Sequence, residues 1–424
     1  MSLDTRLNRR TFVRTLAVGG LAAVSLPARS ANAAGPNDRL TLGVIGVGTQ
    51  GRGHVGSFAG MPDVQVLAVC DVVAERRDAA KQTVERRYAE QRGKDDYKGC
   101  VAYRDFRELL DRKDIDAVLI ATPDHWHALP CVLAARAGKH IYCEKPLTRT
   151  IGEGRRVVET VAKHDVIFQT GSQQRCEFGG KFRQAVELVL NGRIGRVHTV
   201  RVGVGGPAKP CDLPEQPIPD GTDWELWLGP APLRGYNEEL CPKGIHRHFP
   251  NWRDYKEYAN GRLADMGAHH FDIAQWGLGM DAGGPVRVEP PQRGNSGLKF
   301  VYANGVEMFH GGPSGTTFEG TDGTIHVDRD VIESKPAEIF KEPLGDRAVR
   351  VYHATNHRRN WVECVKAKKQ PICPAEVGHR SASVCLLGNI GYWLRRPLAW
   401  DPTAERFLGD AEANALLDPP MRAP

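Results

Sequence analysis

Two motifs that lie far apart in the chain carry side chains suited to redox chemistry. The first, Gly46-Val47-Gly48-Thr49-Gln50-Gly51, directly follows the apolar run Leu40–Ile45. Its three glycines permit a tight turn, a close backbone approach and close helix packing, so the motif predicts a site for a dinucleotide pyrophosphate. The second, Glu144-Lys145-Pro146, follows the apolar run Ile141–Cys143. Together they predict a redox cofactor with a proton-handling lysine beside it.

A carboxylate marks the adenosine end of the predicted cofactor site. Asp71 ends the next apolar run, 20 residues after Gly51. A carboxylate here accepts hydrogen bonds from the ribose hydroxyls and repels a 2′-phosphate, so Asp71 favours NAD over NADP, although the nearby Arg76 and Arg77 favour NADP. Asp71 could also cap the following helix, and the two roles are compatible. The other residues that we expect at the cofactor are Gly46, Gly48, Thr49, Gln50, Thr122, Pro123, His127, Glu144 and Lys145.

The position of Lys145 in the expected sheet decides how it is interpreted. Loops at the carboxyl ends of parallel strands line the ligand crevice, and both Thr122–His127 and Lys145 follow such strands. Lys145 is therefore expected to face the nicotinamide, with Glu144 orienting its amine. The alternatives are a solvated surface lysine and, for Asp124, a simple helix cap.

A second group of ionisable residues lies in Asp265-Met266-Gly267-Ala268-His269-His270-Phe271-Asp272. At helical spacing Asp265, His269 and Asp272 share one face, and His270 is turned away. A histidine held by a carboxylate is a general base, so His269 is expected to take a hydroxyl proton while Lys145 bonds the same oxygen. The alternative is a histidine that only packs inside a helix. A metal site is not expected, because the histidines at 246, 248, 269 and 270 match no standard spacing.

The apolar runs predict an α/β architecture in two parts. Up to Gly171, buried strands alternate with charged helices, which is typical of a doubly wound parallel sheet. The expected strands are Leu40–Ile45, Val64–Cys70, Ala117–Ala121, His140–Cys143 and Val166–Gln169, and the expected helices include Val73–Gly93 and Ile151–His164. Beyond Gly171 an α plus antiparallel β pattern follows, with strands at Val197–Val204, Leu298–Tyr302, Gly305–Phe309, Thr316–Glu319 and Thr324–Asp328 and helices at Gly180–Asn191, Gly261–Gly277, Asn356–Lys368 and Ala375–Arg395.

The N-terminal 33 residues have the composition of a targeting segment. Asn8–Arg14 resembles a twin-arginine export signal, Thr15–Pro27 is apolar but too short to span a bilayer, and Ala31-Asn32-Ala33 fits a cleavage site. We therefore expect an exported, periplasmic protein without a membrane anchor after cleavage; the alternative is a basic tail with a chance arginine pair. This segment carries five arginines and one aspartate, so it supplies +4 of the net charge of +6, and no nucleic-acid partner is expected. Among the ten cysteines, pairing of Cys211 with Cys241 stays open.

Taken together, these motifs resemble the Gfo/Idh/MocA family of oxidoreductases over about residues 40–400. Gly46-x-Gly48-x-x-Gly51, Thr122-Pro123, Ala137-Gly138-Lys139, Glu144-Lys145-Pro146 and Asp265-x-x-x-His269-x-x-Asp272 match in order. The resemblance implies a Rossmann domain at 39–171, a substrate and oligomerisation domain with a large open sheet at 172–400, a tail at 401–424, and a homodimer or homotetramer. It implies that Lys145, Asp265 and His269 act on a sugar or cyclitol hydroxyl. Candidate substrate contacts are Arg175, Trp252, His270 and Asp272. Departures are Asp124, where asparagine is common, and the long loop Gly206–Tyr258.

Three functions compete. The first is an exported NAD(P)-dependent sugar oxidoreductase whose cofactor travels tightly bound, because no nicotinamide pool exists outside the cytosol. The second is redox-neutral glycoside cleavage by oxidation and elimination, in which aromatic residues of the long loop stack on sugar rings or merely anchor the loop: Trp224, Trp227, Trp252, Tyr255 and Tyr258. The third, a non-catalytic sensor, would lack the acid–base groups, which are present.

Overall fold

The first part of the chain forms a six-stranded parallel sheet. The computed structural model describes residues 38–93 and 96–423, so the expected export signal lies outside the described residues. The strand order is β3-β2-β1-β4-β5-β6, and every neighbouring pair is parallel. The strands are β1 (Leu40–Ile45), β2 (Val64–Cys70), β3 (Val101–Tyr103), β4 (Ala117–Ile120), β5 (His140–Cys143) and β6 (Phe168–Thr170). The predicted doubly wound sheet is therefore confirmed.

Helices cover both faces of this sheet, which is why its central strands are apolar on both sides. They are α2 (Thr49–Ala59), α3 (Ala74–Arg92), α4 (Phe106–Leu110), α5 (Ala128–Arg136), α6 (Ile151–Lys163) and, from the end of the chain, α11 (His357–Ala367). All four residues of β4 are buried, and two separate apolar clusters lie on the two faces of the sheet. The sheet order changes direction between β1 and β4, which opens a crevice at their carboxyl ends.

The second part forms an eight-stranded antiparallel sheet, as expected. Its strands are β7 (Val197–Gly203), β8 (Arg287–Glu289), β9 (Lys299–Val301), β10 (Glu307–Gly320), β11 (Gly323–Val327), β12 (Ile332–Lys335), β13 (Leu398–Asp401) and β14 (Arg406–Phe407). The order is β12-β11-β10-β9-β8-β13-β14, with β7 pairing on β10. Two strands expected at Gly305–Phe309 and Thr316–Glu319 are one long strand, whose register with β7 shifts between His310 and Ser314.

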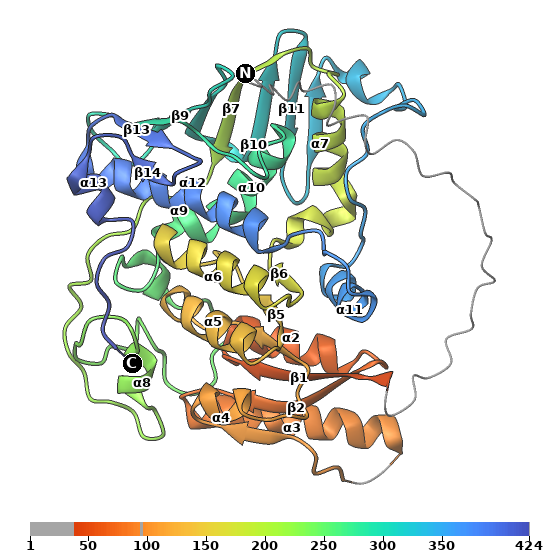
Figure 1. The fold of residues 1–424 in the computed structure, drawn as a ribbon, viewed down its shortest axis with the longest axis vertical. Helices are drawn as coiled ribbons and strands as arrows, with labels where there is room; N and C mark the ends of the chain where they lie inside the picture. Colours follow the sequence, from red (N-terminus) through yellow and green to blue (C-terminus); the bar gives the residue numbers. More distant parts are fainter. Residues whose placement is uncertain (1–37, 94–95, 424) are drawn as a thin grey trace, which may run out of the picture.

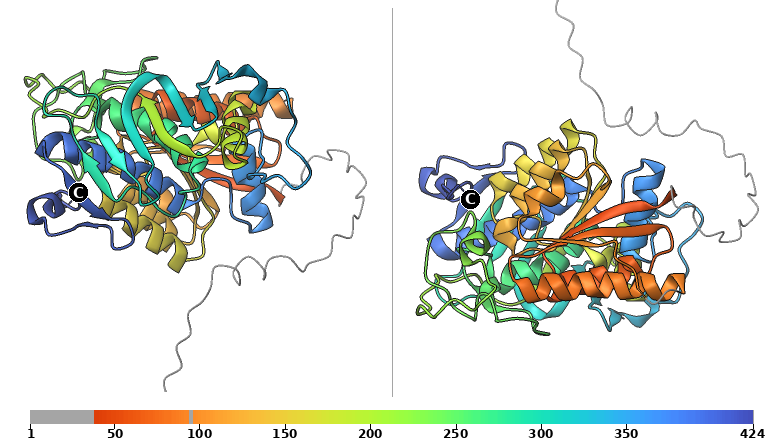
Figure 2. Two further views of the ribbon diagram at one scale, coloured as in Figure 1. Left: turned by 90° about the horizontal axis from the view of Figure 1, so that it is seen from above. Right: turned by 90° about the horizontal axis from the view of Figure 1, so that it is seen from below.

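Helices line the inner face of the large sheet and connect it to the parallel sheet. They are α7 (Lys181–Leu190), α9 (Gly261–Asp265), α10 (Gly267–Gly277) and α12 (Ala375–Leu394), with the short α13 (Ala411–Ala415) near the chain end. Figure 1 shows the large sheet at one end of the molecule, β1 and β2 towards the other, and α12 between the two sheets. Viewed from above, the strands of the large sheet lie over the parallel sheet (Figure 2, left).

The long loop between β7 and α9 has a small core of its own. It contains the short helix α8 (Trp224–Leu228), and its aromatic residues are buried together: Trp224, Trp227, Tyr236, Trp252, Tyr255 and Tyr258. The indoles of Trp224 and Trp227 stack with centroids 4.7 Å apart. Most of these rings therefore anchor the loop, while Trp227 and Trp252 also line the cavity described below.

All ten cysteines are free thiols, so Cys211 and Cys241 are not paired in this structure. Among residues 38–93 and 96–423, no helix has both the length and the apolar character needed to cross a membrane.

Candidate active site

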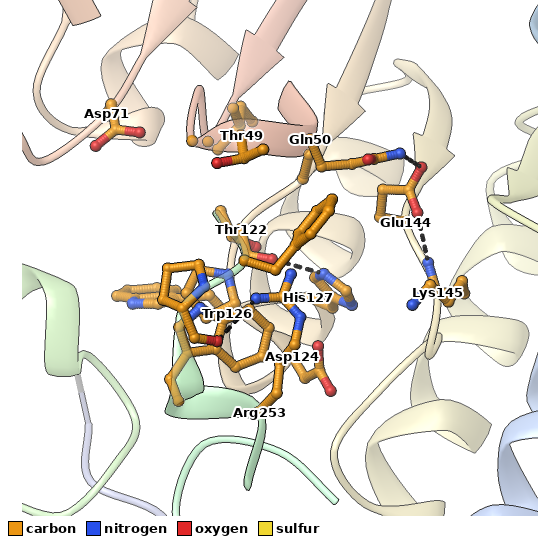
Figure 3. Close-up of a pocket in the computed structure, with 18 of the residues that line it drawn as sticks. Thr49, Gln50, Asp71, Thr122, Asp124, Trp126, His127, Glu144, Lys145 and Arg253 are labelled. Carbon is orange, nitrogen blue, oxygen red and sulfur yellow. Dashed lines mark hydrogen bonds between the residues drawn. The ribbon is translucent and has the colours of Figure 1, made fainter. Parts of the chain in front are cut away.

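A cavity of about 390 Å³ lies where the parallel sheet meets α9, α10 and the long loop. It begins at the carboxyl ends of β1, β2, β4 and β5 and is closed on the other side by residues of the second part of the chain. Figure 3 shows Asp71 and Lys145 on opposite sides of this cavity, with Gln50 and Thr122 between them. Twelve of the thirteen expected catalytic and cofactor residues line the cavity: Gly46, Gly48, Thr49, Gln50, Asp71, Thr122, Pro123, His127, Glu144, Lys145, Asp265 and His269.

 The remaining expected cofactor residue, Gly51, lies just behind this lining, against Gly46.

The glycine motif forms the turn between β1 and α2 and has the geometry of a phosphate cradle. Gly46 has a φ of 82°, which favours glycine, and a Cβ at Gly51 would collide with the carbonyl oxygen of Gly46. A Cβ at Gly48 would meet no atom within 4 Å, so this backbone faces open space. No side chain caps the start of α2, and its first N–H groups are therefore available to an anion. The residues present fit a dinucleotide pyrophosphate.

Replacement of Gly51 by alanine is expected to raise the dissociation constant of NADH at least about tenfold, because the turn must open to relieve the collision with Gly46. Titration of the protein with NADH, followed by nicotinamide fluorescence, measures this. The control is Gly53→Ala in the same helix, where a Cβ meets no atom within 4 Å. This control should keep the affinity of the original protein; equal losses in both variants would contradict the role of the turn.

Asp71 binds backbone N–H groups at the edge of the sheet, but it is not the N-cap of α3, which is Val73, so the expected cap role was wrong. Its carboxylate accepts hydrogen bonds from the backbone N–H groups of Val47 and Val73, both at 2.9 Å, and so holds the glycine turn and the start of α3. It also lines the cavity. Arg76 is buried and donates to the carbonyl oxygens of Pro242 and Gly244 in the long loop. The guanidinium of Arg76 is therefore committed to the loop.

The segment after β4 supplies a polar wall of the cavity. The hydroxyl of Thr122 is buried and has no hydrogen-bond partner among the described residues, as expected of a group that binds a ligand. The imidazole of His127 lies 2.8 Å from the carbonyl oxygen of Pro146 and 3.0 Å from that of Thr122. His127 thus connects the loops after β4 and β5 and positions the residues around it.

Asp124 lies in this wall with 4% of its surface exposed. Burial raises the pKa of its carboxyl to about 8, against the opposing effect of the Arg253 charge and with the help of Asp265. The carboxyl is therefore protonated at neutral pH. The carboxylate of a simple helix cap would be ionised, so the protonated Asp124 differs from the cap considered as an alternative.

The raised pKa predicts how stability depends on pH. The folded protein keeps the Asp124 proton up to about pH 8, whereas the unfolded chain releases it near pH 4, so this group weakens folding progressively as the pH rises between these values. Relative to the original protein, Asp124→Asn is expected to gain about 3 kcal/mol of unfolding free energy between pH 5 and pH 8. Urea unfolding of the cofactor-stripped proteins at both pH values measures this gain. If the two proteins differ in unfolding free energy by the same amount at pH 5 and pH 8, the Asp124 carboxyl is ionised at both pH values.

Glu144 is held by a set of polar side chains below the glycine turn. Its carboxylate accepts hydrogen bonds from Gln50 at 3.1 Å and Gln173 at 2.8 Å and lies 2.7 Å from the imidazole of His54. Burial works to raise the pKa of Glu144, but these partners and Lys145 outweigh it and hold the pKa well below its usual range. Glu144 touches only the backbone N–H of Lys145, at 3.3 Å, so the expectation that it orients the amine was wrong.

The amine of Lys145 is held instead by Asp265. Nζ donates to the Asp265 carboxylate at 2.8 Å and to its backbone carbonyl oxygen at 2.7 Å. Burial works to raise the pKa of Asp265, but Lys145 and Arg253 outweigh it and hold the pKa well below its usual range. An ammonium group has three N–H donors, and Asp265 uses two of them. One donor of Lys145 is therefore left for a ligand in the cavity.

His269 lies in the same cavity without a carboxylate partner, contrary to expectation. The carboxylate of Asp265 is paired with Lys145 and that of Asp272 with Arg175, so neither holds the imidazole. Nδ1 of His269 has no hydrogen-bond partner among the described residues. Burial, followed by the charges of Lys145 and Arg329, lowers the pKa of His269 well below its usual value. The imidazole is neutral and can accept a proton.

Three expected substrate contacts lie outside the cavity lining. Arg175 and Asp272 form a buried ion pair with two 2.8 Å hydrogen bonds, and Arg175 also pairs with Asp281. His270 is buried on the far side of α10, 3.6 Å from Asp328. These three residues are structural because each faces the packed interior rather than the cavity. Trp252, the fourth expected contact, does line the cavity.

Several lining residues were not anticipated. They are Gln173, His246, Phe249, Arg253, Arg329 and Arg358. Gln173 lies two residues before Arg175, which the sequence suggested as a substrate contact. The sequence therefore pointed to the right segment but to the wrong residue in it. The others come from the long loop, the turn after β11 and α11, where no local pattern marks a ligand. Among the described residues, no cluster of three or more ligating side chains could hold a metal ion.

Comparison with known proteins agrees with this architecture. Residues 40–172 match the model described as oxidoreductase family, NAD-binding Rossmann fold, and residues 208–424 match the model of the oxidoreductase family, C-terminal alpha/beta domain. The chain is 26% identical over 373 residues to a myo-inositol 2-dehydrogenase of Thermotoga maritima, which covers 82% of this chain and 94% of the relative.

Other similarities are more limited. A glycosyl hydrolase family 109 protein of Shewanella pealeana is 34% identical over 175 residues, covering 37% of this chain and 38% of that protein. The crystal structure of a scyllo-inositol dehydrogenase from Lactobacillus casei superimposes with a TM-score of 0.57 at 18% identity, covering 85% of this chain and 98% of that one. The match of both parts, in this order, shows that the chain belongs to the Gfo/Idh/MocA family of NAD(P)-dependent oxidoreductases.

Proposed function

We propose that the protein oxidises a hydroxyl group of a sugar or cyclitol with NAD as the hydride acceptor. The observation that carries this proposal is the meeting of Lys145 and His269, from separate parts of the chain, in the cavity onto which the glycine turn opens. The inositol dehydrogenases among the relatives support a polyhydroxylated substrate.

The side chains divide the work of the reaction. The neutral imidazole of His269 takes the proton of the substrate hydroxyl, and the free N–H of Lys145 bonds the same oxygen as it becomes a carbonyl oxygen. Asp265 holds the Lys145 amine in place. When bound, NAD supplies the oxidised nicotinamide that accepts the hydride. The carbinol carbon thus loses a hydride and its oxygen loses a proton, which gives a ketone or lactone.

A panel of sugars and cyclitols tests this proposal. Purified protein with added NAD should form NADH with at least one member, followed by nicotinamide absorbance. The same panel with NADP tests the cofactor preference that Asp71 favours: a clear preference for NADP would refute NAD. Absence of NADH with every member, including the acids and phosphates named below, would overturn the proposed oxidation.

We further propose that the protein is exported through residues 1–33 with its cofactor bound. Contacts of the long loop support retention: Thr49 donates to the carbonyl oxygen of His248 at 2.8 Å, and Arg52 and Arg76 donate to loop carbonyl oxygens. The loop is thereby fastened to α2 and α3, beside the phosphate cradle. Denaturation of the protein purified from the periplasm should release about one nucleotide per chain, and an empty protein would count against retention.

A second candidate is redox-neutral glycoside cleavage, in which a transient oxidation makes a neighbouring C–H acidic enough for elimination. The similarity to a glycosyl hydrolase family 109 protein favours it. Aryl glycosides distinguish the two functions: release of the aryl group without net NADH supports cleavage, whereas NADH that accumulates with the free sugar supports oxidation.

A further inference from the structure

Six lysine and arginine side chains line the cavity, and four of them have carboxylate partners. Arg104 lies 3.4 Å from Asp223, whereas Arg76 donates to backbone carbonyl oxygens of the long loop. Lys145 and Arg253 share Asp265, at 2.8 and 3.4 Å, and Arg358 lies 3.5 Å from Glu177. The sixth, Arg329, forms no ion pair with a side-chain carboxylate of residues 38–93 or 96–423. Its partner is therefore to be sought in the ligand.

The guanidinium of Arg329 is positioned by neutral groups. It lies over the ring of Phe178, with its central carbon 5.0 Å from the ring centroid, and its Nε donates to the side-chain oxygen of Gln174 at 3.1 Å. Stacking fixes the plane of the guanidinium without neutralising its charge. Its two terminal nitrogens are left to donate elsewhere.

The adjacent carboxylate, Asp328, is directed away from this guanidinium. It accepts hydrogen bonds from the Ser314 hydroxyl at 2.7 Å and from the backbone N–H of Arg329, and it lies 3.6 Å from His270. The turn between β11 and β12 therefore presents the arginine to the cavity and keeps its neighbouring acid in the sheet.

Arg329 lies close to the reacting groups. Arg329 and His269 line the same cavity, and the Arg329 charge contributes, after burial and Lys145, to the low pKa of His269. Asp124, which could offset a positive charge, is protonated below about pH 8. This part of the cavity is therefore positive at neutral pH and favours an anionic ligand.

We propose that the substrate carries an anionic group and that Arg329 binds it while Lys145 and His269 act on the hydroxyl. The planar fork of a guanidinium fits a carboxylate, as in a uronic or aldonic acid, and equally a phosphate ester. The substrate class is then an acidic sugar, and this inference rests on the proposed oxidation.

Matched substrates test the inference. We expect the kcat/KM of the original protein for glucuronate, galacturonate, gluconate or glucose 6-phosphate to exceed that for the parent neutral sugar about 10- to 100-fold. Arg329→Gln should remove this preference by raising KM with little change in kcat, and Arg329→Lys should retain part of it. The acids and the phosphate ester together show which anion the site takes.

The control is Arg287→Gln, because Arg287 is an exposed arginine on β8 that pairs with Glu289, and its loss should change no rate. Equal kcat/KM for acidic and neutral sugars, or an equal loss for both in Arg329→Gln, would overturn the inference and leave the proposed oxidation intact. If no sugar is oxidised, calorimetric binding to the NADH-loaded protein decides: tighter binding of the acids that Arg329→Gln abolishes supports the anion site, and equal binding refutes it.

Discussion

Replacement of Lys145 by methionine is expected to lower kcat about 1,000-fold, with the dissociation constant of NADH changed by no more than a few-fold. The variant loses the one N–H donor that Asp265 does not use, and such a donor to a developing charge contributes about 100- to 1,000-fold in rate. Loss of proton-transfer assistance to His269 adds to this. The Asp265 carboxylate keeps Arg253 at 3.4 Å and Arg262 at 3.6 Å, so the fold should survive.

The matched control is Lys139→Met, which removes a buried lysine that directly precedes β5. Lys139 donates to the carbonyl oxygens of Arg112 and Ile115, at 2.7 and 2.9 Å, and lies outside the cavity. This variant should lose about 1–3 kcal/mol of unfolding free energy and keep its kcat. Single-turnover NADH formation and urea unfolding on both variants separate the two effects. Turnover that persists in Lys145→Met would mean that Lys145 is not catalytic and would revive a sensor function.

The features that sequence predicted well are those that local chemistry determines. The glycine turn, Asp71 and Lys145 each stand directly after an apolar strand, and strand ends of a parallel sheet meet at one edge. Because the strand pattern fixes the sheet, it also places these residues around one cavity. The change to antiparallel strands follows from the same pattern.

The features that sequence predicted poorly depend on partners distant in the chain. Asp265 and His269 are four residues apart, and both line the cavity, yet the Asp265 carboxylate binds Lys145 rather than the imidazole. Periodicity alone cannot show this, because it does not say which cation from another part of the chain a carboxylate meets. Arg329 reaches the cavity from a turn of the large sheet, and no spacing relates it to the motifs.

The long loop shows a third limit. Its aromatic residues could equally bind sugars or anchor the loop, and the structure uses most of them as a core. The loop residues that line the cavity lie where the loop contacts the helices: His246 meets Thr49 of α2, and Arg253 meets Asp265 of α9. Composition gave no means to separate the two groups, because both are rich in rings and charges.

Arg175→Met is expected to cost about 3–5 kcal/mol of unfolding free energy, because it leaves a fully buried carboxylate without its cation. Asp272 would keep only the Ser381 hydroxyl, at 2.6 Å. Burial works to lower the pKa of Arg175, but Asp272 and Asp281 outweigh it and raise the pKa well above its ordinary value. Urea unfolding at neutral pH measures the loss.

Two further variants separate a structural pair from a substrate contact. The double variant Arg175→Met with Asp272→Asn removes both charges and should be more stable than Arg175→Met alone. Arg156→Met breaks a half-exposed pair with Asp418 and should cost less than about 1 kcal/mol. A different result would contradict the structural role: Arg175→Met no more destabilised than Arg156→Met, but with a raised KM. The guanidinium would then bind substrate, and its buried pair with Asp272 would not be what holds α10 against the segment after β6.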